Sequence, residues 1–144
     1  MADRRNPTYY AGDLRADLVA AAADLIAERG ADAVSLREVA RRVGVSHAAP
    51  AHHFEDRTGL LTAVATNGFS QLRAAVAGAR RGKKGSRGIV AAGVAYVTYA
   101  SANWTVFELM FRSTVLRPDD AYLEAGAAAR AELEQAVTDA QRSG

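Results

Sequence analysis

The sequence of 144 residues contains no cysteine, which excludes disulfide bonds, iron–sulfur clusters and thiolate zinc sites. It also lacks the roughly 18 uninterrupted apolar residues that a membrane-spanning helix needs. The basic start at Met1–Pro7 is not followed by the apolar run of a signal peptide. These absences exclude an exported disulfide scaffold and an integral membrane protein, and they predict a cytoplasmic protein.

The chain also lacks an excess of charge of one sign. Eighteen basic residues face 16 acidic ones, so the formal net charge of +2 favours an anionic partner without identifying one. Apolar residues make up 49% and charged residues 24%, which is typical of soluble globular proteins. The length fits one compact domain or two small domains that share a core.

Apolar residues recur every three or four positions between residues 14 and 26. This spacing predicts a first helix, with Asp13 as its N-cap and Gly30 as its end. No segment shows the strict alternation of a strand, and no internal repeat is present. The predicted class is therefore all-α.

A helix, a tight turn and a second helix follow. Ser35 and Glu38 can cap each other's backbone donors at the start of a short helix that ends at Gly44. Glycine readily takes the left-handed conformation that terminates a helix. Ser46 is predicted to cap the next helix, which runs through His53.

Four further helices are predicted. Glu55 and Asp56 supply negative charge at the start of a long fourth helix that includes residues 60–76. The glycine-rich basic segment 80–88 predicts a solvated loop. The remaining helices are expected over residues 89–100, over 104–111 with Asn103 as cap, and over 121–141 after Pro118-Asp119-Asp120.

The segment from Leu36 to Phe54 has the most informative spacing. A small residue at Ala40 lets two helices cross closely, and Gly44 makes the turn between them. The second helix then projects its N-terminal half outward, as required for reading a DNA major groove. An ordinary helical hairpin has the same outline. The spacing alone leaves both interpretations open.

These residues resemble a known family. The resemblance rests on Ser35-Leu36-Arg37-Glu38-Val39-Ala40-Arg41-Arg42-Val43-Gly44-Val45-Ser46, then His53-Phe54, Arg57 and Leu60-Leu61, preceded by Tyr10-Ala11-Gly12-Asp13-Leu14-Arg15 and the Gly30 stop. This pattern is similar to that of the TetR-like transcriptional regulators. It is dense from about residue 10 to 65 and looser afterwards, although Phe107–Phe111 is similar to a segment in the ligand domain of one subgroup.

The resemblance implies two domains. Residues 1–57 would form a three-helix DNA-binding domain, and the long fourth helix would join it to a helical ligand-sensing and dimerisation domain over residues 58–144. Relatives usually carry two more helices beyond the position of Gly144, so this second domain is expected to be shortened. Those two helices normally build the dimer interface.

The resemblance also assigns roles in DNA binding. Ser35, Arg37, His53 and Arg57 fall where such regulators hold phosphates, which sets register without reading sequence. Side chains at the start of the recognition helix reach base edges or thymine methyl groups. The residues at these positions are Ser46, His47, Ala48, Ala49, Ala51 and His52.

Two residues of this segment stand out. Most relatives carry an aromatic residue where this chain has Ala51, so one phosphate or base contact is absent. Pro50 has no amide donor and is expected about four residues into the helix, where it costs a hydrogen bond unless the first turn is tightened. A shortened or distorted recognition helix and a lower operator affinity are therefore expected.

The second half is rich in aromatic residues at helical spacing. Residue by residue this pattern is typical of a core, whereas the resemblance favours a pocket that shares residues with the core. Tyr99 and Asn103, with Gln71, are polar groups that can orient a ligand. The candidate ligand-binding residues are Phe69, Leu72, Tyr96, Tyr99, Asn103, Trp104, Phe107, Met110, Phe111 and Tyr122.

The expected function is a ligand-responsive regulator of transcription. As a repressor it would release palindromic double-stranded operator DNA when a small apolar or amphipathic effector enters the C-terminal helices and moves the fourth helix. A homodimer is required to hold two half-sites, and without the usual last helices it would pair through another surface, such as the last helix of this chain. The alternative is a helical ligand-binding or protein-interaction module with weak or no operator binding.

No cofactor or enzyme activity is expected. His52 and His53 point about 100° apart on a helix and His47 lies a turn away, so no metal site is predicted. The run Gly82-Lys83-Lys84-Gly85 lacks the spacing of a phosphate-binding loop. No nucleophile elbow or paired-carboxylate site is recognisable.

Overall fold

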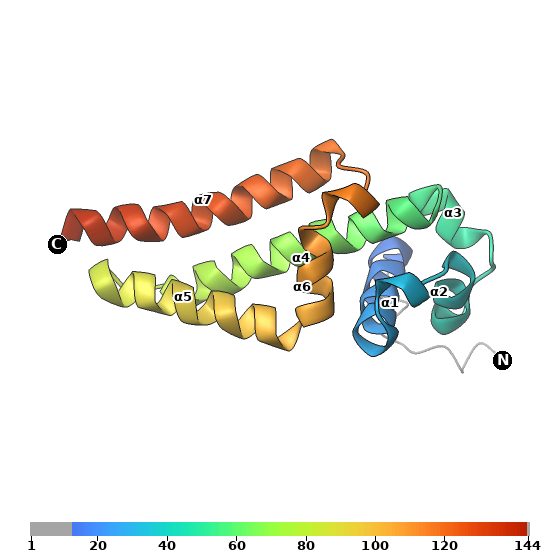
Figure 1. Ribbon diagram of the computed structural model, residues 1–144, viewed down its shortest axis with the longest axis horizontal. Helices are drawn as coiled ribbons and strands as arrows, with labels where there is room; N and C mark the ends of the chain where they lie inside the picture. Colours follow the sequence, from blue (N-terminus) through green and yellow to red (C-terminus); the bar gives the residue numbers. More distant parts are fainter. Residues whose placement is uncertain (1–12, 144) are drawn as a thin grey trace.

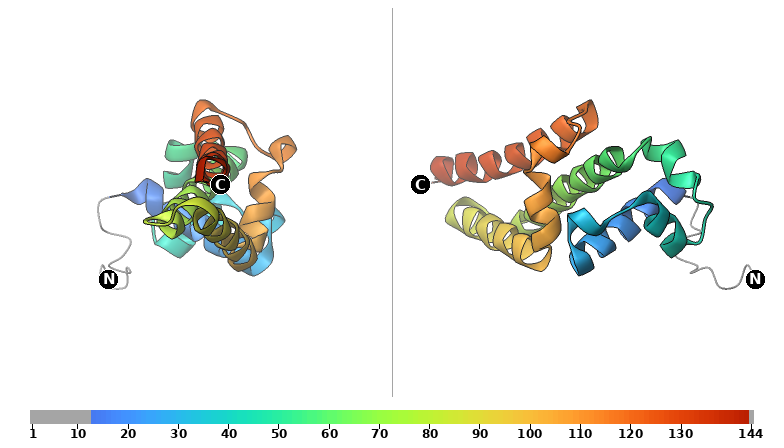
Figure 2. Two further views of the ribbon diagram at one scale, coloured as in Figure 1. Left: turned by 90° about the vertical axis from the view of Figure 1, so that its left-hand side faces the viewer. Right: turned by 45° about the vertical axis from the view of Figure 1, so that its right-hand side comes forward.

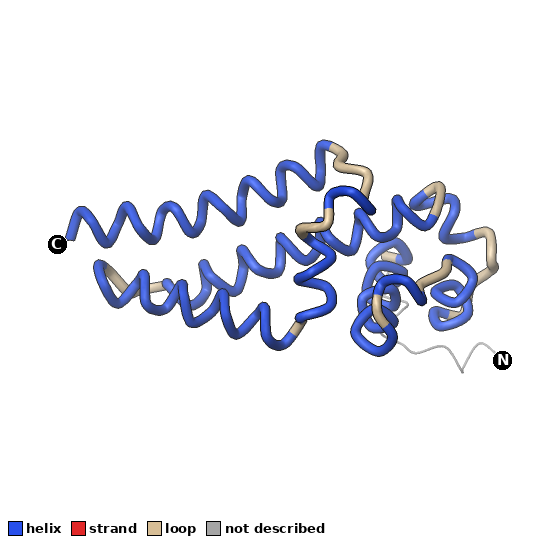
Figure 3. The backbone as a smooth tube through the Cα atoms, in the orientation of Figure 1, coloured by secondary structure: helices blue, strands red, loops and turns tan. Residues whose placement is uncertain are grey.

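The computed structural model describes residues 13–143, and within that range all regular structure is helical, as expected (Figures 1 and 3). The predictions for Met1–Pro7, for Tyr10–Gly12 and for Gly144 lie outside the described residues. The α-helices are α1 (Leu14–Arg29), α2 (Leu36–Val43), α3 (Ala49–Phe54), α4 (Arg57–Arg80), α5 (Gly85–Ala102), α6 (Trp104–Met110) and α7 (Asp120–Ser143). Short 3-10 helices occupy Ala31–Ala33 and Ser113–Val115.

The capping predicted for α1 and α2 is largely confirmed. The Asp13 carboxylate accepts a hydrogen bond from the Ala16 amide at 3.0 Å, and the Ser35 hydroxyl accepts one from the Glu38 amide at 3.1 Å. Gly44 ends α2 with φ 86° and ψ 36°, the left-handed conformation. The reciprocal half of the Ser35–Glu38 cap is not made, because the Glu38 carboxylate pairs with arginines instead.

The predicted start of the third helix is wrong. Ser46 does not cap it: α3 begins at Ala49 with Ala48 at the N-cap, and the Ser46 carbonyl only accepts a turn hydrogen bond from the Ala49 amide at 3.1 Å. Pro50 therefore lies in the first turn, where a helix needs no amide donor. The helix is short, as expected, but because it starts late rather than because Pro50 breaks it.

Helix α4 organises the molecule. Its N-cap is Asp56, whose carboxylate accepts from the Gly59 amide at 2.8 Å. Helices α1, α5, α6 and α7 all pack against it. Figures 1 and 2 show α1, α2 and α3 gathered at one end of α4, with α5 and α7 flanking its other half. One hydrophobic cluster runs through both groups of helices.

Three expectations for the second half need correction. The loop predicted over residues 80–88 is confined to residues 81–84, because α4 continues to Arg80 and α5 already starts at Gly85. Asn103 occupies the N-cap of α6 without a side-chain capping bond, since its amide donates to the Tyr99 carbonyl at 3.0 Å. Helix α6 ends at Met110, which leaves Phe111 in the connection to α7.

Candidate nucleic-acid interface

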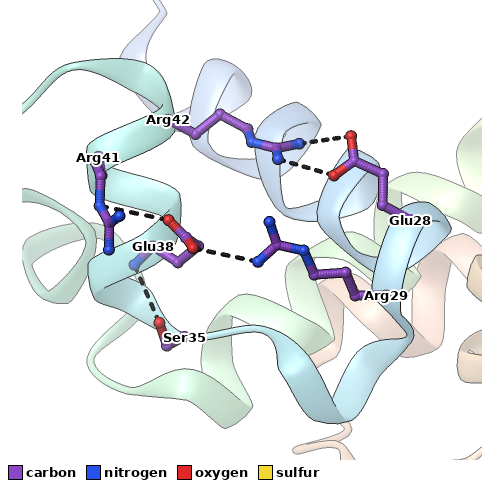
Figure 4. Close-up of polar contacts among 6 residues, drawn as sticks. All are labelled: Glu28, Arg29, Ser35, Glu38, Arg41 and Arg42. Atoms are coloured by element: carbon purple, nitrogen blue, oxygen red, sulfur yellow. Dashed lines mark hydrogen bonds and ion pairs between the residues drawn. The ribbon is translucent and has the colours of Figure 1, made fainter.

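Charged side chains brace α2 against α1 (Figure 4). Arg42 donates to both carboxylate oxygens of Glu28, at 3.1 and 2.8 Å, and Glu38 lies 3.3 Å from Arg29 and 3.5 Å from Arg41. The hydrogen bond from Arg42 holds the pKa of Glu28 below its usual range, which keeps the pair charged. The brace fixes the position of α2 and so of the turn that leads to α3.

Helix α3 presents one face to the core and the other to solvent. Pro50 and Phe54, one turn apart, are buried and anchor the helix. The Arg15 guanidinium lies 5.0 Å from the centre of the Phe54 ring and covers it. Ala51, His52 and His53 are exposed on the outer face. A partner that approaches this end of the molecule therefore meets the polar face of α3.

The ten predicted DNA-binding residues lie on α2 and α3, in the turns before them and at the first residue of α4. All are exposed except Ala49 and Arg57, which are half-buried. Ser46, His47 and Ala48 lie in the turn before α3 rather than on its first turn. Residues 35–54 carry three arginines against one acidic residue, Glu38, but Arg41 pairs with Glu38 and Arg42 pairs with Glu28. Within residues 13–143 Arg37 is exposed and forms no ion pair, so it supplies the free positive charge beside the exposed histidines.

Arg57 is engaged within the protein. Its Nε donates to the Val34 carbonyl at 2.7 Å, and a terminal guanidinium nitrogen donates to the Ala31 carbonyl. These bonds tie the start of α4 to the turn that precedes α2. The resemblance placed Arg57 at the phosphate backbone, whereas its two hydrogen bonds here give it a positioning role.

The backbone of the turn that links α3 to α4 is strained. Glu55 has φ 69° and ψ −58°, a positive φ that no other non-glycine residue of the range 13–143 adopts. The Asp56 amide donates to the Phe54 carbonyl at 2.8 Å, which closes a γ-turn of the rare, strained kind. This tight turn sets the direction of α3 relative to α4.

The ten predicted ligand-binding residues do not share one cavity. Five line a cavity of about 480 Å³ between α4, α5, α7 and the chain after α6: Phe69, Leu72, Tyr96, Phe111 and Tyr122. Asn103 and Trp104, with Gln71, border a second cavity of about 310 Å³, and Tyr99 borders a third. Phe107 and Met110 line none of these cavities.

The ten predicted ligand-binding residues also differ in their solvent exposure. Trp104 and Phe111 are 59% and 55% exposed, whereas Met110 is fully buried. Burial raises the pKa of the Tyr99 hydroxyl, which donates to the Gln71 side chain at 3.2 Å. The aromatic stripe therefore supplies core, cavity wall and exposed surface together.

Sequence reasoning missed a large open groove beside α5. The groove, of about 1290 Å³, is lined by Val90, Val94 and small residues, with Lys83, Lys84 and Arg87 at one end. Val90, Val94 and Val97 are 61–63% exposed. Their three-and-four spacing looks like a core stripe in sequence, and only the packing of α5 reveals that this stripe faces outward.

Metal sites and membrane spans have no candidates within residues 13–143. No three histidine, aspartate or glutamate side chains in this range are grouped so that they could hold a metal ion. None of the helices in this range has both the length and the apolarity needed to cross a membrane.

A short helix, a glycine turn and a second helix with its polar face outward define a helix-turn-helix protein. Residues 18–64 match the family model of the bacterial regulatory proteins, tetR family. HTH-type transcriptional regulator BetI of Klebsiella pneumoniae (strain 342) is 42% identical over 62 residues, which are 43% of this chain and 32% of that protein. The match thus spans about a third of this curated relative.

Similar solved structures extend over nearly the whole chain. A protein with unknown function from Rhodococcus sp. RHA1 is 37% identical, with a TM-score of 0.79 over 96% of this chain and 73% of that one. With the match to the family model, this similarity shows that the chain belongs to the TetR family of bacterial regulatory proteins. The TetR family transcriptional regulator PfmR of Thermus thermophilus shares the fold at 24% identity, with a TM-score of 0.67 over 88% of this chain and 71% of that one.

Proposed function

We propose that this protein is a transcriptional regulator that binds duplex operator DNA through α2 and α3. The observation that carries the proposal is the outer face of α3, which is exposed and polar, lies beside the exposed Arg37 of α2 and is held in place by the α1–α2 brace. A short helix presented in this way fits the major groove, and α2 with its exposed Arg37 lies beside it to meet the phosphates.

Binding of an effector would release the DNA. Residues 1–57 would act as the DNA-binding domain and residues 58–144 as the sensing domain, with α4 shared between them. A small apolar or amphipathic molecule suits the cavity lined by Phe69, Phe111 and Tyr122. Its entry would displace α4 and with it α3, so the protein is proposed to act as a repressor.

A homodimer completes the scheme, since a palindromic operator presents two half-sites about 34–36 Å apart or a multiple of that spacing. The exposed valine face of α5 supports association, because monomeric proteins seldom leave such an apolar stripe uncovered. Two recognition helices held at a fixed separation would make DNA binding sensitive to a small shift of α4.

The proposal is tested by titrating the protein against duplex DNA from upstream of its own coding sequence at several salt concentrations. We expect one preferred sequence and an affinity that falls by about 10³-fold or more between about 50 and 200 mM salt. Uniformly weak binding without a preferred sequence would instead favour the protein-interaction module.

Variants separate the roles on the interface. We expect Arg37→Ala to weaken binding to every duplex and to flatten the salt slope, and His47→Ala to change the preferred sequence. Arg73→Ala is the matched control, because Arg73 is an exposed arginine on α4 about 24 Å along the helix from Arg57. If Arg73→Ala weakened binding as much as Arg37→Ala, the assignment of the interface would be wrong.

A further inference from the structure

The connector between α6 and α7, residues 111–119, touches two distant parts of the molecule. It begins at Phe111, which lines the cavity of about 480 Å³ described above, here called the aromatic cavity. It then reaches the start of α4, next to α3. Its two ends are held by different kinds of contact, so each can be perturbed separately.

The first end is fixed by aromatic packing. The Phe111 ring lies 5.3 Å from that of Phe69 in an edge-to-face arrangement, and Phe69 lies 5.7 Å from Tyr122. The buried Tyr122 hydroxyl donates to the carbonyl of Met110, immediately before the connector, at 2.6 Å. These contacts join the wall of the cavity to the start of the connector.

The second end is fixed by Arg117. Its amide donates to the hydroxyl of Thr62 on α4 at 2.8 Å, and that buried hydroxyl donates in turn to the Thr58 carbonyl. The guanidinium forms an ion pair with Asp56 at 2.6 Å and lies 3.7 Å from the carboxylate of Glu55. Arg117 thus binds the residues that link α3 to α4.

The two carboxylates that Arg117 contacts belong to the turn that joins α3 to α4. Glu55 and Asp56 follow Phe54, the last residue of α3, and Glu55 holds the strained turn. A cavity of about 560 Å³ with a mixed polar and apolar lining, bordered by Arg15, Glu55 and Arg117, lies beside the ion pair. Without Arg117, Asp56 keeps the hydrogen bond from the Gly59 amide, whereas Glu55 has no other ion pair among the described residues.

We propose that Arg117 is a positioning residue that couples the aromatic cavity to the recognition helix through the connector. While the ion pair with Asp56 holds, the turn at Glu55 is fixed and α3 keeps its orientation. When the connector shifts, Arg117 withdraws and α3 gains freedom. The consequence for DNA rests on the proposed function, whereas the structural coupling does not.

Hydrogen–deuterium exchange of the intact protein tests the contact. We expect Arg117→Gln to speed exchange at the amides of residues 49–59 by about two- to fivefold, as suits a partly exposed ion pair. Arg117→Lys restores protection in part, because the charge is kept. Arg112→Gln is the matched control: Arg112 lies on the same connector and has no ion pair or side-chain hydrogen bond to the described residues. Equal exchange in the Arg117→Gln and Arg112→Gln variants would overturn the proposal.

A double-mutant cycle tests the coupling itself. Tyr122→Phe keeps the ring but removes the bond to Met110, and we expect it to alter exchange at residues 49–59 in the native background. In the Arg117→Gln background the same change should have no further effect on those amides. Additive effects would show that the connector does not act through Arg117 and would refute the coupling.

DNA affinity is measured on the same variants, with a duplex that the native protein selects from a random pool. At fixed salt we expect Arg117→Gln to bind this duplex about two- to fivefold more weakly than Arg112→Gln, which loses the same charge. Equal affinities would overturn the effect on recognition. If the native protein selects no duplex, the proposed function fails, while the exchange measurements still decide the coupling.

Discussion

At the scale of single residues, Gly59 has the tightest surroundings among the helical glycines. A Cβ atom at this position would lie 1.9 Å from the carbonyl oxygen of Phe54 and 3.3 Å from the guanidinium of Arg117. The first of these neighbours is backbone, which cannot turn aside. The close approach of the α3 end to the first turn of α4 therefore requires glycine.

We predict that Gly59→Ala destabilises the protein by about 3 kcal/mol, the upper part of the range for overpacked sites. Gly78→Ala in the same helix is the control: a Cβ atom there would have no neighbour within 4 Å, so the change should be neutral or stabilise by up to about 1 kcal/mol. Urea denaturation followed by circular dichroism measures both. Similar stabilities would contradict the packing at Gly59.

Acid titration of Asp56 provides a second residue-scale prediction. The Gly59 amide, and after it the Arg117 guanidinium, hold the pKa of this carboxyl below its usual range. Its contribution to stability is present above the unfolded pKa of about 3.9 and is lost as pH falls through the lower folded pKa. Carboxyl-carbon NMR should show this low midpoint, and Arg117→Gln should raise it only in part, since the Gly59 amide remains. An ordinary midpoint in the native protein would refute the contacts.

Local residue chemistry was predictable where the partners are close in sequence. Asp13, Ser35 and Gly44 act within their own turns, so the pattern alone identified them as caps and stops. The cap at Ser46 failed because α3 begins only at Ala49, with Ala48 at the N-cap. Arg117 was missed because its carboxylate partners lie about 60 residues earlier in the chain.

At the scale of elements, the turn before α2 is attached to α4 through the two hydrogen bonds of Arg57. The rigid fork of a guanidinium reaches both the Val34 and the Ala31 carbonyl, whereas a lysine ammonium offers a single point of donation. An arginine-to-lysine substitution at residue 57 therefore keeps the positive charge but loses the attachment to both carbonyls.

We predict that Arg57→Lys lowers stability by about 1–2 kcal/mol and weakens binding to every duplex, although the charge is kept. The salt slope should stay the same, because no phosphate contact is lost. The control is Arg37→Lys, in which an exposed cation remains available to phosphate. Native-like binding by Arg57→Lys together with a flatter slope for Arg57→Ala would support a direct phosphate contact instead.

The identity of the helices was predictable, but their orientation was not. The stripe of Val90, Val94 and Val97 shows that α5 is amphipathic without telling which neighbour covers it. In the same way the aromatic residues of α5, α6 and α7 could be recognised as a group, yet their division among cavities depends on how α4 passes between them. Periodicity determines faces, and tertiary packing determines what each face meets.

At the scale of the whole molecule, association through α5 can be tested by placing a charge on its exposed face. We predict that Val94→Glu lowers the mass measured by light scattering from that of a dimer to that of a monomer, because a buried unpaired carboxylate is costly. Val137→Glu on α7, also exposed, should leave the mass unchanged. Dissociation by Val137→Glu alone would assign the interface to α7, and a monomeric native protein would exclude the dimer.

Helix α4 belongs to both halves of the molecule. Leu60, Leu61 and Val64, all essentially inaccessible to solvent, lie just past the proposed domain boundary, in the same hydrophobic cluster as Leu18 and Leu25 of α1. An excised fragment ending at residue 57 would uncover the part of the apolar side of α1 that packs against α4 and α6. The two halves should therefore melt in one cooperative step, and the proposed DNA-binding domain cannot be moved to another protein without part of α4.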